Sequence, residues 1–323
     1  MNKDKNSQLS FFPIHQTKLF YYDEYFNFFS NLYKKKLLPN KILLTGKSGI
    51  GKSTFAYHFI NFIMSEGQDF SYDYNKFAIN PLNKAFRLVN QLMHPNFYLV
   101  DNLVDKKNID VKQVRNMINY ANSTSFEKEI KFIKIDNAEY LNKHSLNALL
   151  KIIEEPNPGT YFFIIHNSSV QIAETLKSRC IEFKISFSNQ FKQNILNNLT
   201  EFHNIELENK ILDEIYNPHN SPGNTLNLIK LIQNFSINAE NFNLKKLIGR
   251  LMELNLKNKN NINLNSLQNA VELFFLKEIR KSKNKSRILL NYSKSINNFN
   301  LLKKYNIDMN NMFYCIKENI IHG

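Results

Sequence analysis

The stretch GKSGIGKS at residues 46–53 has the G-x-x-x-x-G-K-[ST] spacing of a phosphate-binding loop. An apolar run at residues 42–44 precedes it, and apolar residues at helical spacing follow it at residues 55–60. A loop of this kind needs a strand before it and a helix after it, and both patterns are present. The glycines let backbone N–H groups turn inward around phosphate oxygens, and the start of the helix adds its dipole. The stretch therefore predicts a site for ATP or GTP, against the alternative of a glycine-rich turn with a chance lysine.

Two side chains of this loop have the chemistry that a nucleotide requires. Lys52 supplies a positive charge for the outer phosphates, and the hydroxyl of Ser53 is a suitable ligand for Mg²⁺. The predicted nucleotide-binding residues are Gly46, Lys47, Ser48, Gly49, Ile50, Gly51, Lys52, Ser53 and Thr54.

A second apolar run, residues 132–135, leads to Asp136 and is expected to form a strand that ends at this acid. With Ser53, Asp136 is predicted to hold the Mg²⁺ that accompanies ATP, although Asp136 could instead only cap a turn. Many ATPases of this architecture place Glu directly after the Asp, where this chain has Asn137, which cannot accept a proton at neutral pH. Glu139 is expected to be a poor substitute. The pattern predicts a nucleotide binder that hydrolyses weakly on its own.

Three further segments narrow the class of protein. An amphipathic helix is predicted at residues 145–155 before Pro156, and an all-apolar strand at 161–165. A short helical stretch then reaches Ser178-Arg179-Cys180. The chain resembles the clamp-loader branch of the AAA+ ATPases at residues 147–156 and 178–180. These residues follow the phosphate loop and Asp136 in the order typical of that branch. Within that branch, residues 40–185 look most like the delta-prime family of DNA polymerase III subunits.

The resemblance implies roles for individual residues. Arg179 matches the arginine finger that reaches into a neighbouring subunit's ATP site, where a planar charged fork stabilises a transferring phosphoryl group. Asn167 matches a sensor of the γ-phosphate. An ordinary ion-pair arginine and a turn-capping asparagine are the alternatives. Lys112 and Arg115 share one side of a helix capped by Asp110, and the resemblance makes them possible DNA-facing residues, against a simply solvated face.

The chain also departs from the family pattern. Many relatives carry a four-cysteine zinc module, whereas this chain has only Cys180 and Cys315, so no zinc is expected. Both cysteines are expected to be small buried side chains. Some relatives have a nucleotide-reading arginine in the lid, where this chain has Asn224.

The expected fold class is α/β, an AAA+ P-loop doubly wound parallel sheet followed by a small helical lid and an all-α C-terminal collar domain. The predicted domains are 1–186 for nucleotide binding, 187–236 for the lid and 237–323 for the oligomerisation collar. Helical pattern is also predicted over most of residues 10–36, at 225–233 after a turn at 221–223, and from 301 onward. The strand candidates are 40–45, 97–101, 131–136, 160–165 and 181–185.

The net charge of +14 is weak support for nucleic-acid binding, because Lys, Asn and Ile are abundant throughout the 323 residues. Six basic residues and one acid lie between residues 277 and 287, a run expected to be a helix end followed by a charged loop. No run of 18 apolar residues occurs, so a cytoplasmic protein with no membrane contact is expected. The resemblance implies other clamp-loader subunits of the gamma/tau and delta types, the sliding clamp and primer-template DNA as partners.

Two other classes of protein remain open at this point. A self-sufficient AAA+ ATPase acting on DNA, such as a helicase loader or a branch-migration motor, should keep a catalytic glutamate and a lid arginine. The residues Asn137 and Asn224 argue against it. A P-loop kinase would need a phosphoacceptor pocket and lid arginines that the pattern does not reveal.

Overall fold

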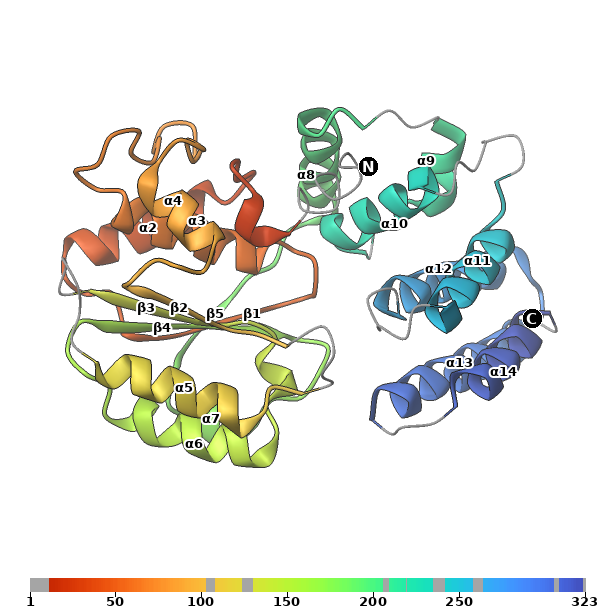
Figure 1. The fold of residues 1–323 in the computed structure, drawn as a ribbon. Coiled ribbons are helices and arrows are strands. Elements are labelled where there is room, and N and C mark those ends of the chain that lie inside the picture. The colour runs from red at the N-terminus through yellow and green to blue at the C-terminus, as the bar shows by residue number, and fades with distance from the viewer. Residues whose placement is uncertain are drawn as a thin grey trace. The chain divides into compact units, whose positions relative to one another are not determined.

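The chain divides into two compact units, with the division between Phe191 and Lys192. The computed structural model describes residues 12–102, 108–123, 130–205, 209–218, 220–234, 242–257, 264–304 and 308–321. The first unit contains a sheet between two layers of helices, and the second unit contains helices (Figure 1).

The sheet of the first unit has five strands in the order β2-β3-β4-β1-β5. All neighbouring strands are parallel. The strands are β1 (Lys41–Gly46), β2 (Phe97–Val100), β3 (Lys131–Ile135), β4 (Thr160–Asn167) and β5 (Ile181–Lys184). The five predicted strands and the doubly wound parallel class are thereby confirmed, with boundaries that shift by one or two residues.

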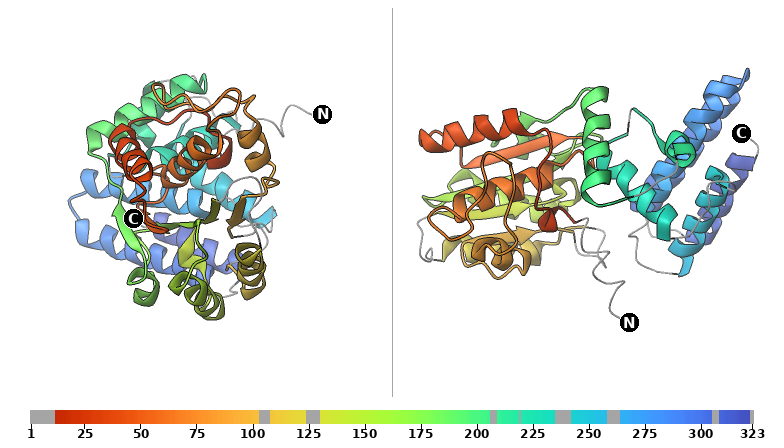
Figure 2. Two further views of the ribbon diagram at one scale, coloured as in Figure 1. Left: turned by 90° about the vertical axis from the view of Figure 1, so that its left-hand side faces the viewer. Right: turned by 90° about the horizontal axis from the view of Figure 1, so that it is seen from above.

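Helices cover both faces of the sheet, which explains why its strands are apolar on both sides (Figures 1 and 2). One face carries α2 (Asp23–Lys34), α3 (Lys52–Met64) and α4 (Lys84–Asn90). The other carries α5 (Val111–Asn122), α6 (Lys143–Glu154) and α7 (Glu174–Lys177). Short 3₁₀ turns lie at Pro13–His15 (η1) and Ala138–Tyr140 (η2). Successive side chains of a strand point to opposite faces of the sheet, so alternate residues lie in two separate cores, one under each layer of helices.

The core under α2 and α3 is dominated by aromatic rings. Phe26 of α2 is fully buried, and its ring centroid lies within 6.2 Å of six others. Those rings belong to Phe55, Phe59, Phe62, Tyr72, Tyr74 and Phe77. Most of the pairs meet edge to face, the arrangement that the ring quadrupole favours. This core holds α3, and with it the loop that precedes α3, against the sheet.

The opposite core is mostly aliphatic. Leu43 and Ile133 of the sheet pack with Val114 and Met117 of α5 and with Ile153 of α6. Asp110 caps α5 as predicted, and Gln113 completes a reciprocal capping box.

The helices of the second unit pack on one another in chain order. They are α9 (Asn209–Ile215), α10 (Pro222–Asn234), α11 (Leu244–Lys257), α12 (Leu264–Lys281), α13 (Lys285–Lys304) and α14 (Met309–Ile321), after α8 (Asn189–Phe202) at the junction. Successive helices from α11 to α14 are in contact, α14 also contacts α11, and α10 packs on α9 and α12. The subdivision into a lid at 187–236 and a collar at 237–323 stays a prediction.

Three helix predictions are wrong in detail. Residues 16–22 are not helical, and Lys18 instead forms a β-bridge with Ala78. Helix α10 begins at Pro222 rather than after a turn, because Pro suits a first helical position and Ser221 accepts from the Asn224 N–H at 3.4 Å. The basic run at 277–287 contains a connection of only three residues between α12 and α13, and α13 covers residues 285–304, which the sequence pattern had not indicated. No helix in the described ranges is long and apolar enough to cross a membrane.

The aromatic core predicts a large difference between two neighbouring phenylalanines of α2. Replacing the buried Phe26 with Ala should lower the free energy of unfolding by about 3–5 kcal/mol, because the cavity loses contacts with six rings. Phe28, whose exposed fraction is 51%, is the matched control, and Phe28→Ala should cost about 1 kcal/mol or less. Urea denaturation followed by circular dichroism measures both, and equal losses would contradict the assignment of Phe26 to the core.

Candidate functional site

The carboxyl edge of the sheet collects the polar residues that the sequence singles out. Strand β1 ends at Gly46, and Asn167 at the end of β4 is its register partner. Asp136 directly follows β3, and Asp101 directly follows the neighbouring strand β2. Because all five strands are parallel, these residues share one edge, which is where ligands of open α/β sheets bind.

The phosphate loop occupies residues 46–53 between β1 and α3, as predicted. Gly51 has a φ of 104°, a left-handed conformation that L side chains rarely adopt. A Cβ at Gly46 would lie 2.4 Å from the carbonyl oxygen of Ile185, so the chain leaving β5 admits only glycine there. The Tyr22 hydroxyl donates to the Ile50 carbonyl at 3.0 Å and fixes the middle of the loop.

Lys52 lies folded within the loop. Its ammonium donates to the carbonyl oxygens of Gly46 at 2.7 Å and Lys47 at 2.8 Å. Burial lowers the pKa of Lys52 to about 8, although the nearby carboxylates of Glu139 and Asp136 act in the opposite direction. The Lys52 ammonium is thus held inside the loop, with backbone carbonyl oxygens as its partners.

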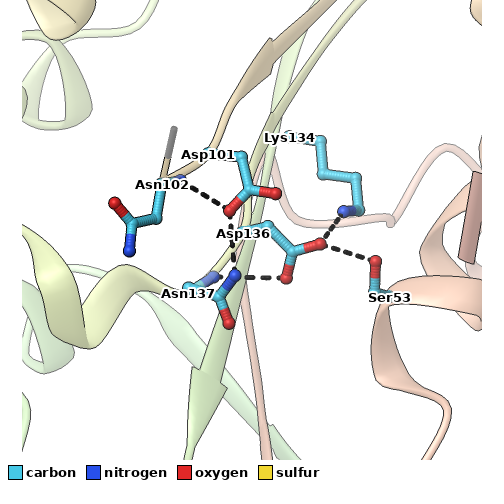
Figure 3. A network of polar contacts seen from close by, with 6 residues as sticks. All are labelled: Ser53, Asp101, Asn102, Lys134, Asp136 and Asn137. Atoms are coloured by element: carbon cyan, nitrogen blue, oxygen red, sulfur yellow. Dashed lines mark hydrogen bonds and ion pairs between the residues drawn. The ribbon is translucent and has the colours of Figure 1, made fainter. Parts of the chain in front are cut away.

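Ser53 and Asp136 are brought together as the sequence predicts. The Ser53 hydroxyl donates to Oδ2 of Asp136 at 2.6 Å (Figure 3). The same oxygen accepts from the ammonium of Lys134, which lies two residues earlier on β3. Burial alone would raise the pKa of Asp136, but Lys134 and Ser53 outweigh it and lower that pKa. Asp136 is therefore an ionised carboxylate with a cation already beside it.

These donors fit a magnesium ion poorly. The hydroxyl and the carboxylate are the correct chemical types for Mg²⁺, which prefers oxygen ligands. However, a positive charge already lies on the carboxylate, and like charges about 4 Å apart repel by roughly 4 kcal/mol per unit pair at an effective dielectric constant of 20. The sequence pattern does not single out Lys134, because which face of β3 packs on α3 is decided only in the folded chain.

Asn137 points away from the phosphate loop. Its backbone is left-handed, with a φ of 54°, which Asn tolerates better than most residues. Its amide donates to Oδ1 of Asp101 at 2.8 Å, and its backbone N–H lies 3.2 Å from Oδ1 of Asp136 (Figure 3). Burial and the charge of Asp136 raise the pKa of Asp101. Position 137 thus carries an amide that donates to the Asp101 carboxylate, and it carries no group that could accept a proton.

Glu139 lies nearer to the site than the sequence pattern indicated. It is part of η2, and its carboxylate accepts from the backbone N–H of Asn167 at 3.1 Å. Its charge is also the largest of those that raise the pKa of Lys52. Asn167 in turn accepts from the Ser169 N–H at 3.1 Å, which is the turn-capping contact that was its alternative role. Asn167 therefore lies beside the loop, but its amide oxygen is used within its own turn.

Arg179 is held by contacts within its own chain in this structure. Its Nε and Nη2 atoms lie 2.7 Å and 2.6 Å from Oε1 of Glu154, and Nη1 donates to the Thr175 carbonyl at 2.9 Å. The exposed fractions of the Arg179 and Glu154 side chains are 36% and 50%. The ion pair with Glu154, which was the alternative to an arginine finger, is therefore present, and the Arg179 side chain is still partly exposed to solvent.

The remaining candidates lie apart from the loop. Lys112 and Arg115 are both exposed on α5, opposite the buried Val114 and Met117. In the basic run, Lys277 pairs with Glu214 at 2.7 Å.

The cysteines only partly follow the expectation of burial. Cys180 is half-buried, whereas Cys315 is exposed, so the expectation is wrong for Cys315, which lies on an outer position of α14. Within the described part of the chain, no group of three or more His, Cys, Asp or Glu side chains could hold a metal ion.

The family model described as DNA polymerase III, delta subunit matches residues 22–190, which is more than half of the chain. The chain belongs to the DNA polymerase III delta subunit family. The match begins at the tyrosine that fixes the phosphate loop and ends just before the division between the two units.

Known members of the family have similar sequences. The DNA polymerase III subunit delta' of Buchnera aphidicola subsp. Baizongia pistaciae is 30% identical over 161 residues, 46% of this chain and 46% of that protein. The subunit delta' of Pseudomonas aeruginosa is 29% identical over 142 residues, 43% of this chain and 41% of that protein. The chain thus matches about half of the length of these relatives or less. The resemblance to delta-prime clamp-loader subunits is confirmed.

A solved structure is similar over a longer range. The DNA polymerase III gamma subunit-related protein of Thermotoga maritima covers 90% of this chain and 99% of its own, with 13% identity and a TM-score of 0.47.

Proposed function

We propose that this delta-family chain is a delta-prime-type subunit of the replicative clamp loader, and that it binds ATP at residues 46–54. The observation that supports binding most directly is the phosphate loop itself: its left-handed glycines, its buried Lys52 ammonium and the start of α3 all belong to one short segment. In this proposal the chain helps to load the sliding clamp onto primer-template DNA. Its partners are the gamma/tau and delta types of subunit.

We further propose that the chain hydrolyses ATP weakly and contributes Arg179 to the ATP site of a neighbouring subunit. Asn137 has no proton-accepting group and its amide is committed to Asp101, which supports weak hydrolysis. The exposed guanidinium of Arg179 supports a role in trans, with Glu154 as its partner when the subunit is free. Lys112 and Arg115 are proposed as contacts to DNA phosphates, supported by their exposure on one helix.

The first test of nucleotide binding is Lys52→Ala. The variant should lose most of its affinity for a fluorescent ATP analogue, at least about tenfold, because the loop then lacks its positive charge. Equilibrium titration of the full chain measures the affinity. Lys84→Ala is the matched control, since it removes one exposed lysine of the same unit outside the loop. Equal affinities for the wild type and Lys52→Ala would contradict nucleotide binding at this loop.

Hydrolysis by the isolated chain should be slow. A positioned general base contributes roughly 10²–10⁴-fold to such a step, and Asn137 cannot act as one. Asn137→Glu should raise the steady-state rate of phosphate release, although the left-handed backbone at this position limits how well a glutamate can be placed. Asn137→Gln, whose side chain has the same size as glutamate but no basic group, should not raise that rate. Brisk turnover by the lone wild-type chain would contradict the proposal and favour a self-sufficient motor.

Arg179→Ala should leave the fold and the chain's own ATP affinity nearly unchanged, because an exposed ion pair is worth about 0–1 kcal/mol. It should lower the DNA- and clamp-stimulated ATPase of the reconstituted loader, since an arginine supplied in trans can be worth roughly 10³–10⁵ in rate at one site. Arg179→Lys should rescue little, because a point charge lacks the fork geometry.

Two controls separate this role from a structural one. Lys177→Ala removes a nearby cation that pairs with Glu182, and it should have no effect on the loader. Glu154→Gln weakens the hold on Arg179 without removing the arginine, and the loader should keep its rate. If Arg179→Ala assembles normally and the loader turns over ATP at the wild-type rate, Arg179 is only structural.

A further inference from the structure

Lys134 lies on β3 and Asp136 directly follows the strand, and residues two apart along an extended chain project to the same side. The Lys134 ammonium and the Ser53 hydroxyl meet on one oxygen of Asp136, Oδ2 (Figure 3). The other oxygen, Oδ1, lies 3.2 Å from the backbone N–H of Asn137. Both oxygens of the carboxylate that would hold Mg²⁺ are therefore engaged by groups of this chain.

Lys134 is fixed in this position by its surroundings. Its side chain is 0% exposed, so the aliphatic stem lies in the core between the sheet and α3. Its ammonium lies 4.2 Å from the ring centroid of Tyr57 on α3, close enough for a cation–π interaction. Moving the ammonium away from Asp136 would leave a fully buried cation, and a carboxylate side chain that is 13% exposed, without their ion-pair partner, which is strongly unfavourable.

The neighbouring acid, Asp101, is engaged through one of its two carboxylate oxygens. Oδ1 of Asp101 already accepts from the Asn102 N–H at 2.6 Å and from the Asn137 amide at 2.8 Å. A dication bound to Asp136 would have to displace Lys134 or lie directly beside it. Both arrangements are costly in a site that is largely shielded from water.

We infer that Lys134 takes the place of the magnesium ion at Asp136, so that the phosphate loop binds a nucleoside triphosphate with little dependence on a divalent cation. The inference rests on the proposed function, because it concerns the same loop, and it departs from the Mg²⁺ expected at Ser53 and Asp136. A fixed internal cation would suit a subunit that holds nucleotide without turning it over. Mg²⁺ normally neutralises the charge that develops on the phosphate oxygens during phosphoryl transfer, and this site would lack that effect.

The wild-type chain provides the first test. A fluorescent ATP analogue is titrated into the full-length protein in Mg²⁺ and, at matched ionic strength, in EDTA. The two dissociation constants should agree within about threefold. Measurable binding in Mg²⁺ that weakens by about tenfold or more in EDTA would overturn the inference and leave the proposed function intact. An absence of binding in both buffers would overturn the proposed function, and the inference with it.

Lys134→Met supplies the second test, since Met keeps an apolar stem of similar length without the charge. The variant should become dependent on Mg²⁺, with binding at least about tenfold tighter in Mg²⁺ than in EDTA, because the buried carboxylate then lacks a cation. Thermal melting gives a readout without nucleotide: Mg²⁺ should raise the melting temperature of Lys134→Met and leave that of the wild type unchanged.

Lys131→Met is the matched control. Lys131 is also a buried lysine of β3, and its ammonium also lies over a tyrosine ring, that of Tyr120, at 4.9 Å. Its ammonium, however, bonds to the Tyr120 carbonyl at 3.0 Å and not to Asp136. Lys131→Met should bind the analogue equally in Mg²⁺ and EDTA. The role of Lys134 would be overturned if both variants depended on Mg²⁺ to the same extent, or if neither variant depended on Mg²⁺. If Lys134→Met fails to fold, the wild-type comparison decides the question without it.

Discussion

The hydrogen bond between Ser53 and Asp136 joins two segments that lie 83 residues apart in the sequence, and the candidate site depends on it. Strands β1 and β3 are not neighbours, because β4 lies between them. The contact therefore requires that β4 end beside the phosphate loop, which the pairing of Gly46 with Asn167 provides. It also requires that α3 start close to the sheet, where the aromatic core holds it. A parallel sheet with every carboxyl end at one edge satisfies both conditions.

Burial decides the electrostatics of this edge. Lys134 and Asp136 compensate each other where water is largely excluded, and their attraction is accordingly stronger than that of a surface pair. The pKa of Lys134 is raised, since its carboxylate partner outweighs the effect of burial, while the pKa of Asp136 is lowered. The edge thus contains a fixed charge pair before any ligand arrives. The edge is poorly suited to adding a second cation beside Asp136.

The surroundings of the loop explain why it is held so firmly. Tyr22 lies in the aromatic core, stacks on Phe55 of α3 with ring centroids 5.3 Å apart, and donates its hydroxyl to the Ile50 carbonyl. The aromatic core around Phe26 fixes α3 itself. Arg179 differs, because a half-exposed ion pair with Glu154 is its main contact and a surface pair adds little stability. The molecule thus combines a rigid loop with an arginine that a partner could recruit at small cost.

The sequence by itself determined the phosphate loop, the five strands and the family, because each is a local pattern of residue types. Glycine spacing specifies a backbone conformation, and apolar runs specify strands covered on both faces. The sequence also indicated that Asn137 replaces a base.

Only the tertiary structure decided which charged side chains contact one another. Lys134 reads as one lysine in an apolar run, and its position beside Asp136 follows from the face of β3 that packs on α3. The approach of Glu139 to Lys52 depends likewise on the turn after β3, and the pairing of Arg179 with Glu154 on the packing of α6 against α7. The last two contacts join residues far apart in the chain, and the first depends on which face of β3 packs on α3, so local patterns of residue types do not encode these contacts.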